Sequence, residues 1–185
     1  MQPLRVVAAM LALLAASACA APPETIAPPA PSHAPYRLSS GDRLRVIVFG
    51  QDNLSNSYSV DGSGVISMPL IGRVRAQGLT TAELEKSVEA RLRQGFIREP
   101  SVSAEVEAYR PFFVLGGVNA AGQYPFISGI TAQNAVAVAG GFAPRAVESS
   151  VEITRTIDDQ PTTFLAPLAY PLRPGDTVTI QERVF

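Results

Sequence analysis

Residues 113–155 read FVLGGVNAAGQYPFISGITAQNAVAVAGGFAPRAVESSVEITR, and this stretch decides the fold. The apolar run Phe113–Val118 predicts a strand. The small residues 119–122 predict a turn in which Gly122 adopts a positive φ. Residues Gln123–Ile127 return as a second strand, so the stretch begins as a β-hairpin.

A short helix and a third strand are predicted to follow this hairpin. Pro125 places the second strand at a sheet edge, because proline has no N–H for the hydrogen-bond ladder. Thr131 is a candidate N-cap for a helix of small apolar residues, which Gly140-Gly141 ends. Residues Ser149–Arg155 alternate between apolar and polar side chains, which predicts a strand.

Four pieces of the stretch together resemble a known domain. They are Gly116-Gly117-Val118, Gly122-Gln123-Tyr124, Ala139-Gly140-Gly141 and Val151-Glu152-Ile153-Thr154-Arg155. In this order and spacing they resemble the soluble-ligand-binding β-grasp domain of the outer-membrane polysaccharide export proteins. Ala121 departs from the family pattern, which usually has proline before the turn glycine, and this bears on the rigidity of the turn.

The chain before this unit predicts a separate β-rich unit. Residues Arg43–Phe49 alternate and predict a half-buried strand, and Ser59–Ile66 read as strand, glycine turn and strand, a second hairpin. Another alternating strand follows Pro100, with Glu105 and Glu107 facing solvent.

A capped helix lies between these strands. Thr80 and Glu83 have the spacing of a capping box. The aliphatic side chains recur every four residues and predict one buried stripe, formed by Leu84, Val88 and Leu92. Glu85, Lys86, Glu89 and Arg93 are expected to face solvent.

Residues Val60–Gly72, followed by Gly78-Leu79-Thr80 and this helix, resemble the polysaccharide-export domain that precedes the β-grasp domain in the same family. The resemblance implies an α+β protein. Its small β-rich export domain with one capped helix would span residues 36–110, and its β-grasp domain residues 111–185. Both domains contain the pattern Leu-x-x-Gly-Asp-x-apolar-x-apolar, at Leu38–Val46 and Leu172–Ile180, which predicts a tight turn that begins a strand.

Composition restricts the possible functions of the chain. Among 185 residues, 15 Lys+Arg are balanced by 16 Asp+Glu, and their dispersal argues against nucleic acid as a partner. One cysteine and one histidine exclude an internal disulfide and a histidine-based metal cluster. No cofactor and no metal are therefore predicted.

Residues 1–18 predict a signal peptide. Arg5 supplies a basic start, Val6–Ala16 is an apolar run too short to span a membrane, and Ala16-Ser17-Ala18 is a small-residue cleavage site. Cys19 follows directly and is predicted to be the lipid-carrying first residue of the mature chain. The alternative is an ordinary secretory peptide in which this thiol is incidental.

A proline-rich tether is predicted between the lipid and the folded chain. Residues 19–35 include six prolines and few large apolar side chains, so they favour an extended, polyproline-like conformation over a core. His33 lies in this segment and is expected to be a solvated linker residue rather than a catalytic one. In the lipoprotein class, the alanines after the cysteine resemble signals for the outer membrane.

Nothing in the sequence predicts an enzyme. A Ser-His-Asp arrangement would have to use His33. The paired carboxylates Asp158-Asp159 fit a hairpin turn better than a catalytic dyad. The glycines of Gly116–Gly122 are not followed by the lysine of a phosphate-binding loop.

The resemblance implies a lipid-anchored periplasmic component of a capsular polysaccharide or exopolysaccharide export channel, at the periplasmic face of the outer membrane in a Gram-negative envelope. The implied partners are other copies in a homo-oligomeric ring, an inner-membrane chain-length regulator, the polysaccharide and a separate outer-membrane barrel. The alternative is a saccharide-binding sensor or retention module. Aromatic side chains either stack on sugars or form core and subunit contacts; they are Tyr109, Phe112, Phe113, Tyr124 and Phe126.

The end of the sequence bears on how the chain would meet the membrane. Larger members of the family carry a C-terminal amphipathic helix, whereas only Thr177–Phe185 follow Asp176 here. As a helix, this segment would span about 14 Å against roughly 30 Å of hydrocarbon. We therefore expect a short member of the family without the membrane helix.

Overall fold

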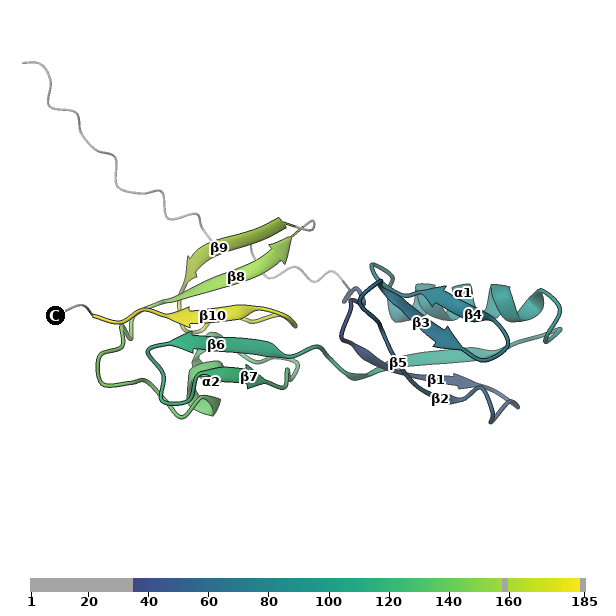
Figure 1. The fold of residues 1–185 in the computed structure, drawn as a ribbon, viewed down its shortest axis with the longest axis horizontal. Helices are drawn as coiled ribbons and strands as arrows, with labels where there is room; N and C mark the ends of the chain where they lie inside the picture. The colour runs from purple at the N-terminus through teal and green to yellow at the C-terminus, as the bar shows by residue number, and fades with distance from the viewer. Residues whose placement is uncertain (1–34, 158–159, 184–185) are drawn as a thin grey trace, which may run out of the picture.

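The structure is a computed structural model that describes residues 35–157 and 160–183. The predicted signal peptide, Cys19, His33 and Asp158-Asp159 lie outside the described residues. The described chain forms two units that lie end to end, each with its own helix and hydrophobic core (Figure 1). It is mostly strand with short helices, which confirms the predicted α+β class. One core lies within residues 38–104 and the other within residues 112–180, and the domain bounds 36–110 and 111–185 stay a prediction.

The first domain is built around strand β1. In chain order, its elements are β1 (Arg43–Val48), β2 (Asn56–Ser59), β3 (Val65–Met68), β4 (Gly72–Arg75), α1 (Thr81–Arg93) and β5 (Val102–Ala108). β1 lies in the middle of an antiparallel sheet with the order β2-β1-β5, and β3 pairs with β4 separately. The alternation along β1 is confirmed, because Leu44, Val46 and Val48 are buried.

The predicted hairpin over residues 59–66 is wrong in its pairing. β2 pairs with β1 and β3 pairs with β4, so the turn carries the chain from one sheet to the other. The turn itself is present, since the N–H of Gly64 donates to the carbonyl of Asp61 at 2.9 Å. Alternation predicts a strand, but it does not select that strand's neighbour.

Helix α1 has the predicted cap and the predicted buried stripe. The N–H of Glu83 donates to Thr80 Oγ1 at 3.2 Å, and the N–H of Thr80 donates to Glu83 Oε2 at 2.8 Å. The stripe is fully buried and consists of Leu84, Val88 and Leu92.

The expectation that Glu85 and Glu89 face solvent is wrong. Both side chains are half-buried and accept hydrogen bonds from the free edge of β5, from the N–H of Ala104 at 2.8 Å and the N–H of Val102 at 3.1 Å. These carboxylates occupy donors that an open strand edge would offer to another chain.

The second domain has a mixed sheet. In chain order, its elements are β6 (Phe112–Gly116), β7 (Gly122–Tyr124), α2 (Ala132–Val138), β8 (Val151–Ile157), β9 (Gln160–Ala166) and β10 (Thr177–Ile180). The strand order is β7-β6-β10-β8-β9, and β10 runs parallel to β6 at the centre. The helix between the second and third strands packs on one face of the sheet, in one core with Val114 and Ile153. This is the β-grasp arrangement that the sequence predicts.

Two details of the first hairpin differ from the prediction. β7 ends at Tyr124, so Pro125 follows the edge strand instead of lying within it. Gly122 does not have a positive φ; Gly116, at the end of β6, has a φ of 81°. A Cβ on Gly116 would lie 2.1 Å from the carbonyl oxygen of Ile180, so glycine is required where β6 and β10 converge.

The two Gly-Asp turns have the same geometry. The glycine of each has a positive φ, 92° and 84°. In the first turn, the N–H of Ser39 donates to Asp42 Oδ2 at 2.8 Å, and in the second the N–H of Arg173 donates to Asp176 Oδ2 at 2.7 Å. The sequence predicts both turns, but not that Asp42 and Asp176 are only 0% and 1% exposed.

Candidate functional site

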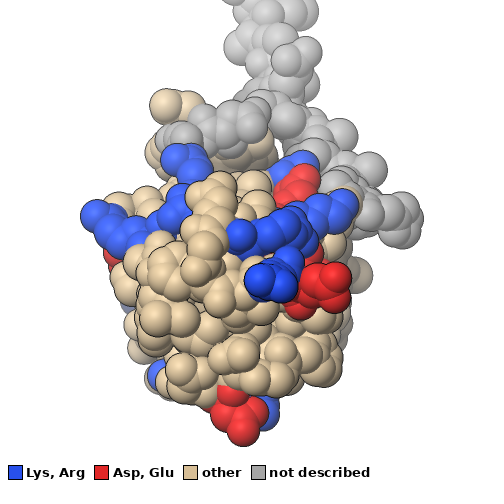
Figure 2. All heavy atoms as spheres, turned by 90° about the vertical axis from the view of Figure 1, so that its right-hand side faces the viewer, with Lys and Arg blue, Asp and Glu red and all other residues tan. Residues whose placement is uncertain are grey.

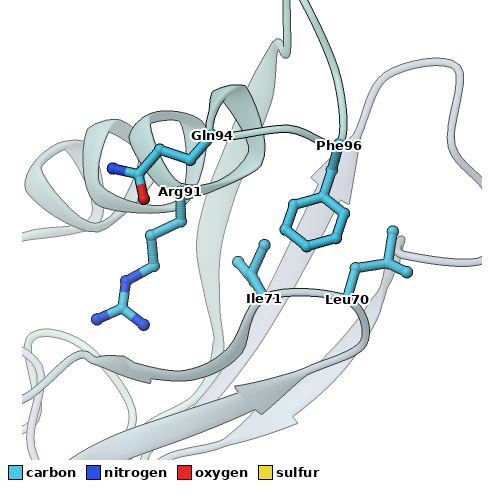
Figure 3. Close-up of a pocket in the computed structure, with 5 residues that line it drawn as sticks. All are labelled: Leu70, Ile71, Arg91, Gln94 and Phe96. Carbon is cyan, nitrogen blue, oxygen red and sulfur yellow. The ribbon is translucent and has the colours of Figure 1, made fainter.

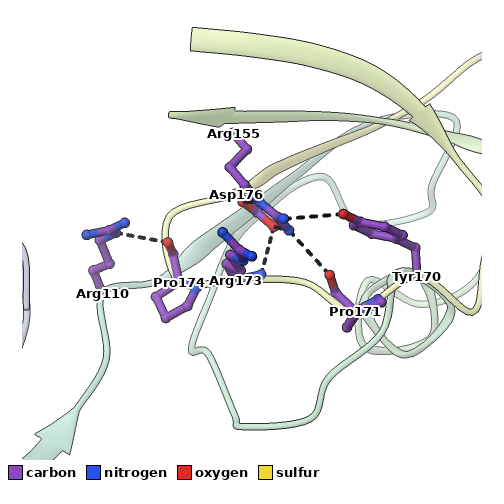
Figure 4. A network of polar contacts seen from close by, with 7 residues as sticks. All are labelled: Arg110, Arg155, Tyr170, Pro171, Arg173, Pro174 and Asp176. Atoms are coloured by element: carbon purple, nitrogen blue, oxygen red, sulfur yellow. Dashed lines mark hydrogen bonds and ion pairs between the residues drawn. The ribbon is translucent and has the colours of Figure 1, made fainter. Parts of the chain in front are cut away.

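Arg110 lies at the junction between the domains and contacts both Gly-Asp turns. Its backbone N–H donates to Asp42 Oδ1 at 2.9 Å, and its Nε donates to the carbonyl of Pro174 at 3.0 Å (Figure 4). A Cβ on Gly175 would lie 2.4 Å from this Nε, so a larger residue at this turn would force the arginine side chain to move. Arg110 therefore connects the two turns where the chain passes from one domain to the other.

Aromatic rings complete the junction. The Tyr109 ring lies edge-on to Tyr36, with centroids 5.0 Å apart, and to Phe126, with centroids 5.5 Å apart. The Tyr36 hydroxyl donates to Asp42 at 2.7 Å. Burial, and then the hydrogen bond to the Asp42 carboxylate, raise the pKa of Tyr36. Edge-to-face rings of this kind add to the stability of an interface.

The other predicted aromatic residues divide between core and surface. Phe112 is fully buried, and Tyr124 lies beside it with centroids 5.9 Å apart. Phe113 is 40% exposed on the opposite face of β6. Of the five, Phe113 is the most exposed, whereas Tyr109, Tyr124 and Phe126 are half-buried and have ring contacts within the described chain.

A buried ion pair lies behind the second turn. Arg155 and Asp176 form two hydrogen bonds of 2.7 and 2.9 Å, with Tyr170 and the carbonyl of Pro171 also in contact with the guanidinium (Figure 4). The Arg155 guanidinium lies 5.7 Å from the ring centroid of Phe164 and 5.5 Å from that of Tyr170. The sequence did not predict this pair, although Arg155 shares the strand face of Val151 and Ile153. Because its partners are protein groups, we assign the pair a structural role.

A hollow of about 200 Å³ lies at the end of the first domain that faces away from the junction. It lies between the β3–β4 loop and the end of α1, and its lining consists of Leu70, Ile71, Arg91, Gln94 and Phe96 (Figure 3). Leu70 and Phe96 are 57% and 51% exposed. Leu70 and Ile71 lie within the family-like segment Val60–Gly72, but no pattern in the sequence predicts a hollow there.

Leu70 has an unfavourable backbone conformation. Its φ is 66°, and it is the one non-glycine residue in the described ranges with a positive φ. The N–H of Ile71 donates to the carbonyl of Pro69 at 2.8 Å, which makes Leu70 the centre of a three-residue turn. A leucine in this left-handed region costs about 1–2 kcal/mol relative to an ordinary conformation.

The other wall of the hollow is fixed by the end of α1. Gly95 has a φ of 111°, and the N–H of Phe96 donates back to the carbonyl of Leu92 at 3.1 Å. Arg91 Nη1 donates to the carbonyl of Arg73 on β4. These contacts hold the aromatic ring and the guanidinium on opposite sides of Ile71 (Figure 3).

Within residues 35–157 and 160–183, no group of three or more His, Cys, Asp or Glu residues could hold a metal ion. In the same ranges, no helix has both the length and the hydrophobicity needed to cross a membrane. Glu105 and Glu107 face solvent, as predicted.

Comparisons with known proteins indicate the family. Residues 30–107, which include the strands of the first domain except the last residue of β5, match the family model described as polysaccharide biosynthesis/export protein. The chain is 33% identical over 118 residues to the exopolysaccharide production protein ExoF of Rhizobium meliloti (strain 1021), covering 57% of this chain and 28% of that protein. It is 26% identical over 111 residues to the polysialic acid transport protein KpsD of Escherichia coli, covering 59% of this chain and 20% of that protein.

The chain thus spans less than a third of the length of these relatives. The family is described by biosynthesis and export, and the relatives by production and transport, which agrees with the prediction that this chain is not an enzyme. The match over the first domain and the two relatives support the predicted resemblance to the polysaccharide export protein family, and a β-grasp domain follows the matched residues.

Proposed function

We propose that this chain is a lipid-anchored periplasmic component of a system that exports capsular polysaccharide or exopolysaccharide across a Gram-negative envelope. The observation that carries the proposal is the family match over residues 30–107, followed directly by a β-grasp domain. The names of the two relatives support the same role, since one concerns exopolysaccharide production and the other polysialic acid transport.

The anchor in this proposal is an acyl group on Cys19. Removal of residues 1–18 would leave this cysteine as the first residue, and the proline-rich segment 19–35 would connect it to the folded chain. Attachment to the periplasmic face of the outer membrane follows from the lipoprotein signal. Support for the anchor comes from the sequence alone.

The proposed assembly is a closed ring of identical chains with head-to-tail contacts. Two opposite faces of the second domain support side-by-side contacts. The sheet face that α2 does not cover exposes Phe113, Leu115 and Leu165, and the helix exposes Val138. The proposed partners beyond the ring are an inner-membrane chain-length regulator, the polysaccharide and a separate outer-membrane barrel.

Deletion of the gene and complementation test this function. Loss of surface polysaccharide in the deletion strain, restored by the wild-type chain, is the expected result. The Cys19→Ser chain is expected to fold, to leave the outer-membrane fraction and to restore export poorly; mass spectrometry of the mature N-terminus checks the lipid directly.

Unchanged polysaccharide export in the deletion strain would contradict the proposal. If the purified chain also stayed monomeric at high concentration, the result would favour a saccharide-binding sensor or retention module. Analytical ultracentrifugation of the lipidated chain in detergent measures the oligomeric state.

A further inference from the structure

The hollow at the free end of the first domain combines the groups that bind a sugar ring. Phe96 offers an exposed aromatic face, Leu70 and Ile71 offer aliphatic surface, and Arg91 and Gln94 offer N–H donors (Figure 3). A pyranose presents C–H groups on its faces and hydroxyl groups at its rim, so one ring can use both kinds of surface. The volume, about 200 Å³, is below the usual range for larger ligands, which suits one sugar unit of a chain.

The backbone conformation of Leu70 indicates that its side chain serves binding and not the stability of the fold. A glycine at a φ of 66° would relieve the backbone strain. The leucine side chain is 57% exposed, so burial within the chain offsets little of that strain. Strained residues of this kind concentrate at binding sites, where the surrounding structure holds them in place.

The charge around the hollow favours an anion. Arg73 is paired with Asp61 at 3.8 Å. The end of α1 and the neighbouring loops carry Arg91, Arg93 and Arg98 against Asp52 and Glu99, and of these Arg91 lines the hollow. Figure 2 shows Lys and Arg side chains across the upper part of this end, with Asp and Glu side chains beside them at the right and at the lower edge, around a broad uncharged surface. Arg91 uses Nη1 to bind the Arg73 carbonyl, and within the described chain its Nε and Nη2 have no assigned partner. A guanidinium with free N–H groups recognises carboxylates in preference to neutral hydroxyls.

We propose that this hollow binds an acidic sugar unit, a uronate or another carboxylate-bearing pyranose, of the polymer that the system exports. Phe96 and Leu70 contact the C–H face of the ring, Arg91 contacts the carboxylate, and Gln94 contacts a hydroxyl group. That the sugar belongs to the exported polymer rests on the proposed function. That the sugar carries a negative charge rests on Arg91 in the lining of the hollow.

A matched pair of oligosaccharides tests the inference. The lipidated chain in detergent is titrated with a short oligogalacturonate and, separately, with its methyl ester, which has the same rings without the negative charge. Calorimetry measures affinity, and ¹⁵N NMR locates the contact. We expect the acid to bind about tenfold more tightly than the ester, with shifted amide signals at residues 70, 91 and 96.

Variants separate contact from folding. Leu70→Gly removes the side chain while relieving the backbone, so it should melt like the wild type and bind about tenfold more weakly. Phe96→Ala should weaken binding to a similar extent. Arg91→Gln should abolish the preference for acid over ester, and Arg91→Lys should retain part of it. Phe49→Ala and Lys86→Gln change exposed side chains that do not line the hollow, and should alter affinity less than about twofold.

Several results would overturn the inference: no binding of oligogalacturonate, equal affinity for acid and ester, or equal losses in the lining and control variants. Amide shifts at residues 70 and 96 that follow protein concentration would show a contact between copies of the chain instead. If oligogalacturonate fails to bind while the wild-type chain restores export in the deletion strain, the inference fails and the proposed function stands. If oligogalacturonate binds but the wild-type chain does not restore export, the hollow is a sugar site and the proposed function fails.

Discussion

Replacing Asp176 with asparagine is expected to destabilise the second domain strongly. The carboxylate is 1% exposed and accepts two hydrogen bonds from Arg155, whose side chain is only 5% exposed. Asparagine keeps the shape and one acceptor, but it leaves the arginine charge buried without a counter-charge. Removing one partner of a buried ion pair costs about 3–5 kcal/mol. At roughly 4 °C per kcal/mol for a domain of this size, the melting temperature should fall by at least about 12 °C.

Asp42→Asn is the matched control, because Asp42 occupies the same position in the equivalent turn. It is equally buried and accepts hydrogen bonds from Ser39, Arg110 and Tyr36, but no buried arginine charge depends on it. The free energy of unfolding should fall by about 1–3 kcal/mol, because only hydrogen bonds are lost. Arg155→Met combined with Asp176→Asn should recover most of the stability lost in the single variant, because no charge is then left unpaired.

Urea denaturation gives the free energy of unfolding, and hydrogen exchange followed by mass spectrometry assigns the loss to a domain. Faster exchange should appear in β8 and β10 for Asp176→Asn, and in β1 for Asp42→Asn. The reasoning is refuted if Asp176→Asn costs no more than Asp42→Asn, or if the double variant is less stable than Asp176→Asn alone.

Three further predictions concern local features of the fold. Val88→Asp places an unpaired charge at a fully buried position of α1, so circular dichroism should show the first domain unfolded at room temperature, and a wild-type melt would contradict the predicted packing. Gly116→Ala puts a Cβ 2.1 Å from the Ile180 carbonyl at a φ of 81°, and should lower the free energy of unfolding by more than about 1 kcal/mol in urea titrations. The N–H of Thr80 lowers the pKa of Glu83, so the capping box stabilises α1 above about pH 4.5 and weakens as the pH falls through the folded pKa; Glu83→Gln should flatten the helical signal across that range.

Local sequence signals predicted most of the fold. The capping box of α1, the N-cap Thr131 of α2, the buried stripe of α1 and the alternation in β1 depend on residues a few positions apart, so they can be read from one chain. The order of the β-grasp elements followed from the resemblance. Strand pairing was harder to predict from the sequence. The turn after β2 has the pattern of a hairpin, but the strands on its two sides, β2 and β3, belong to different sheets.

The site was less predictable than the fold, because its contacts join residues distant in sequence. Arg110 carries no motif, and its place between two turns depends on Pro174, which lies 64 residues further along. Glu85 and Glu89 looked solvent-facing because the uncovered edge of β5 cannot be seen from the helix pattern. The positive φ of Leu70 has no counterpart in the sequence, since leucine rarely adopts it.

The aromatic rings of Tyr36, Tyr109 and Phe126 at the junction determine where the N-terminal segment joins the folded chain. Tyr36 follows the N-terminal segment and lies against Tyr109, so this segment joins the folded chain beside the junction and not at either tip. If Cys19 is acylated, the 16 residues to Pro35 would reach about 50 Å in a polyproline conformation. The lipid would then hold the folded chain at the junction between the domains, and the two domains would tilt about this point in opposite directions. Tilting one domain towards the membrane would swing the hollow on the other domain away from it.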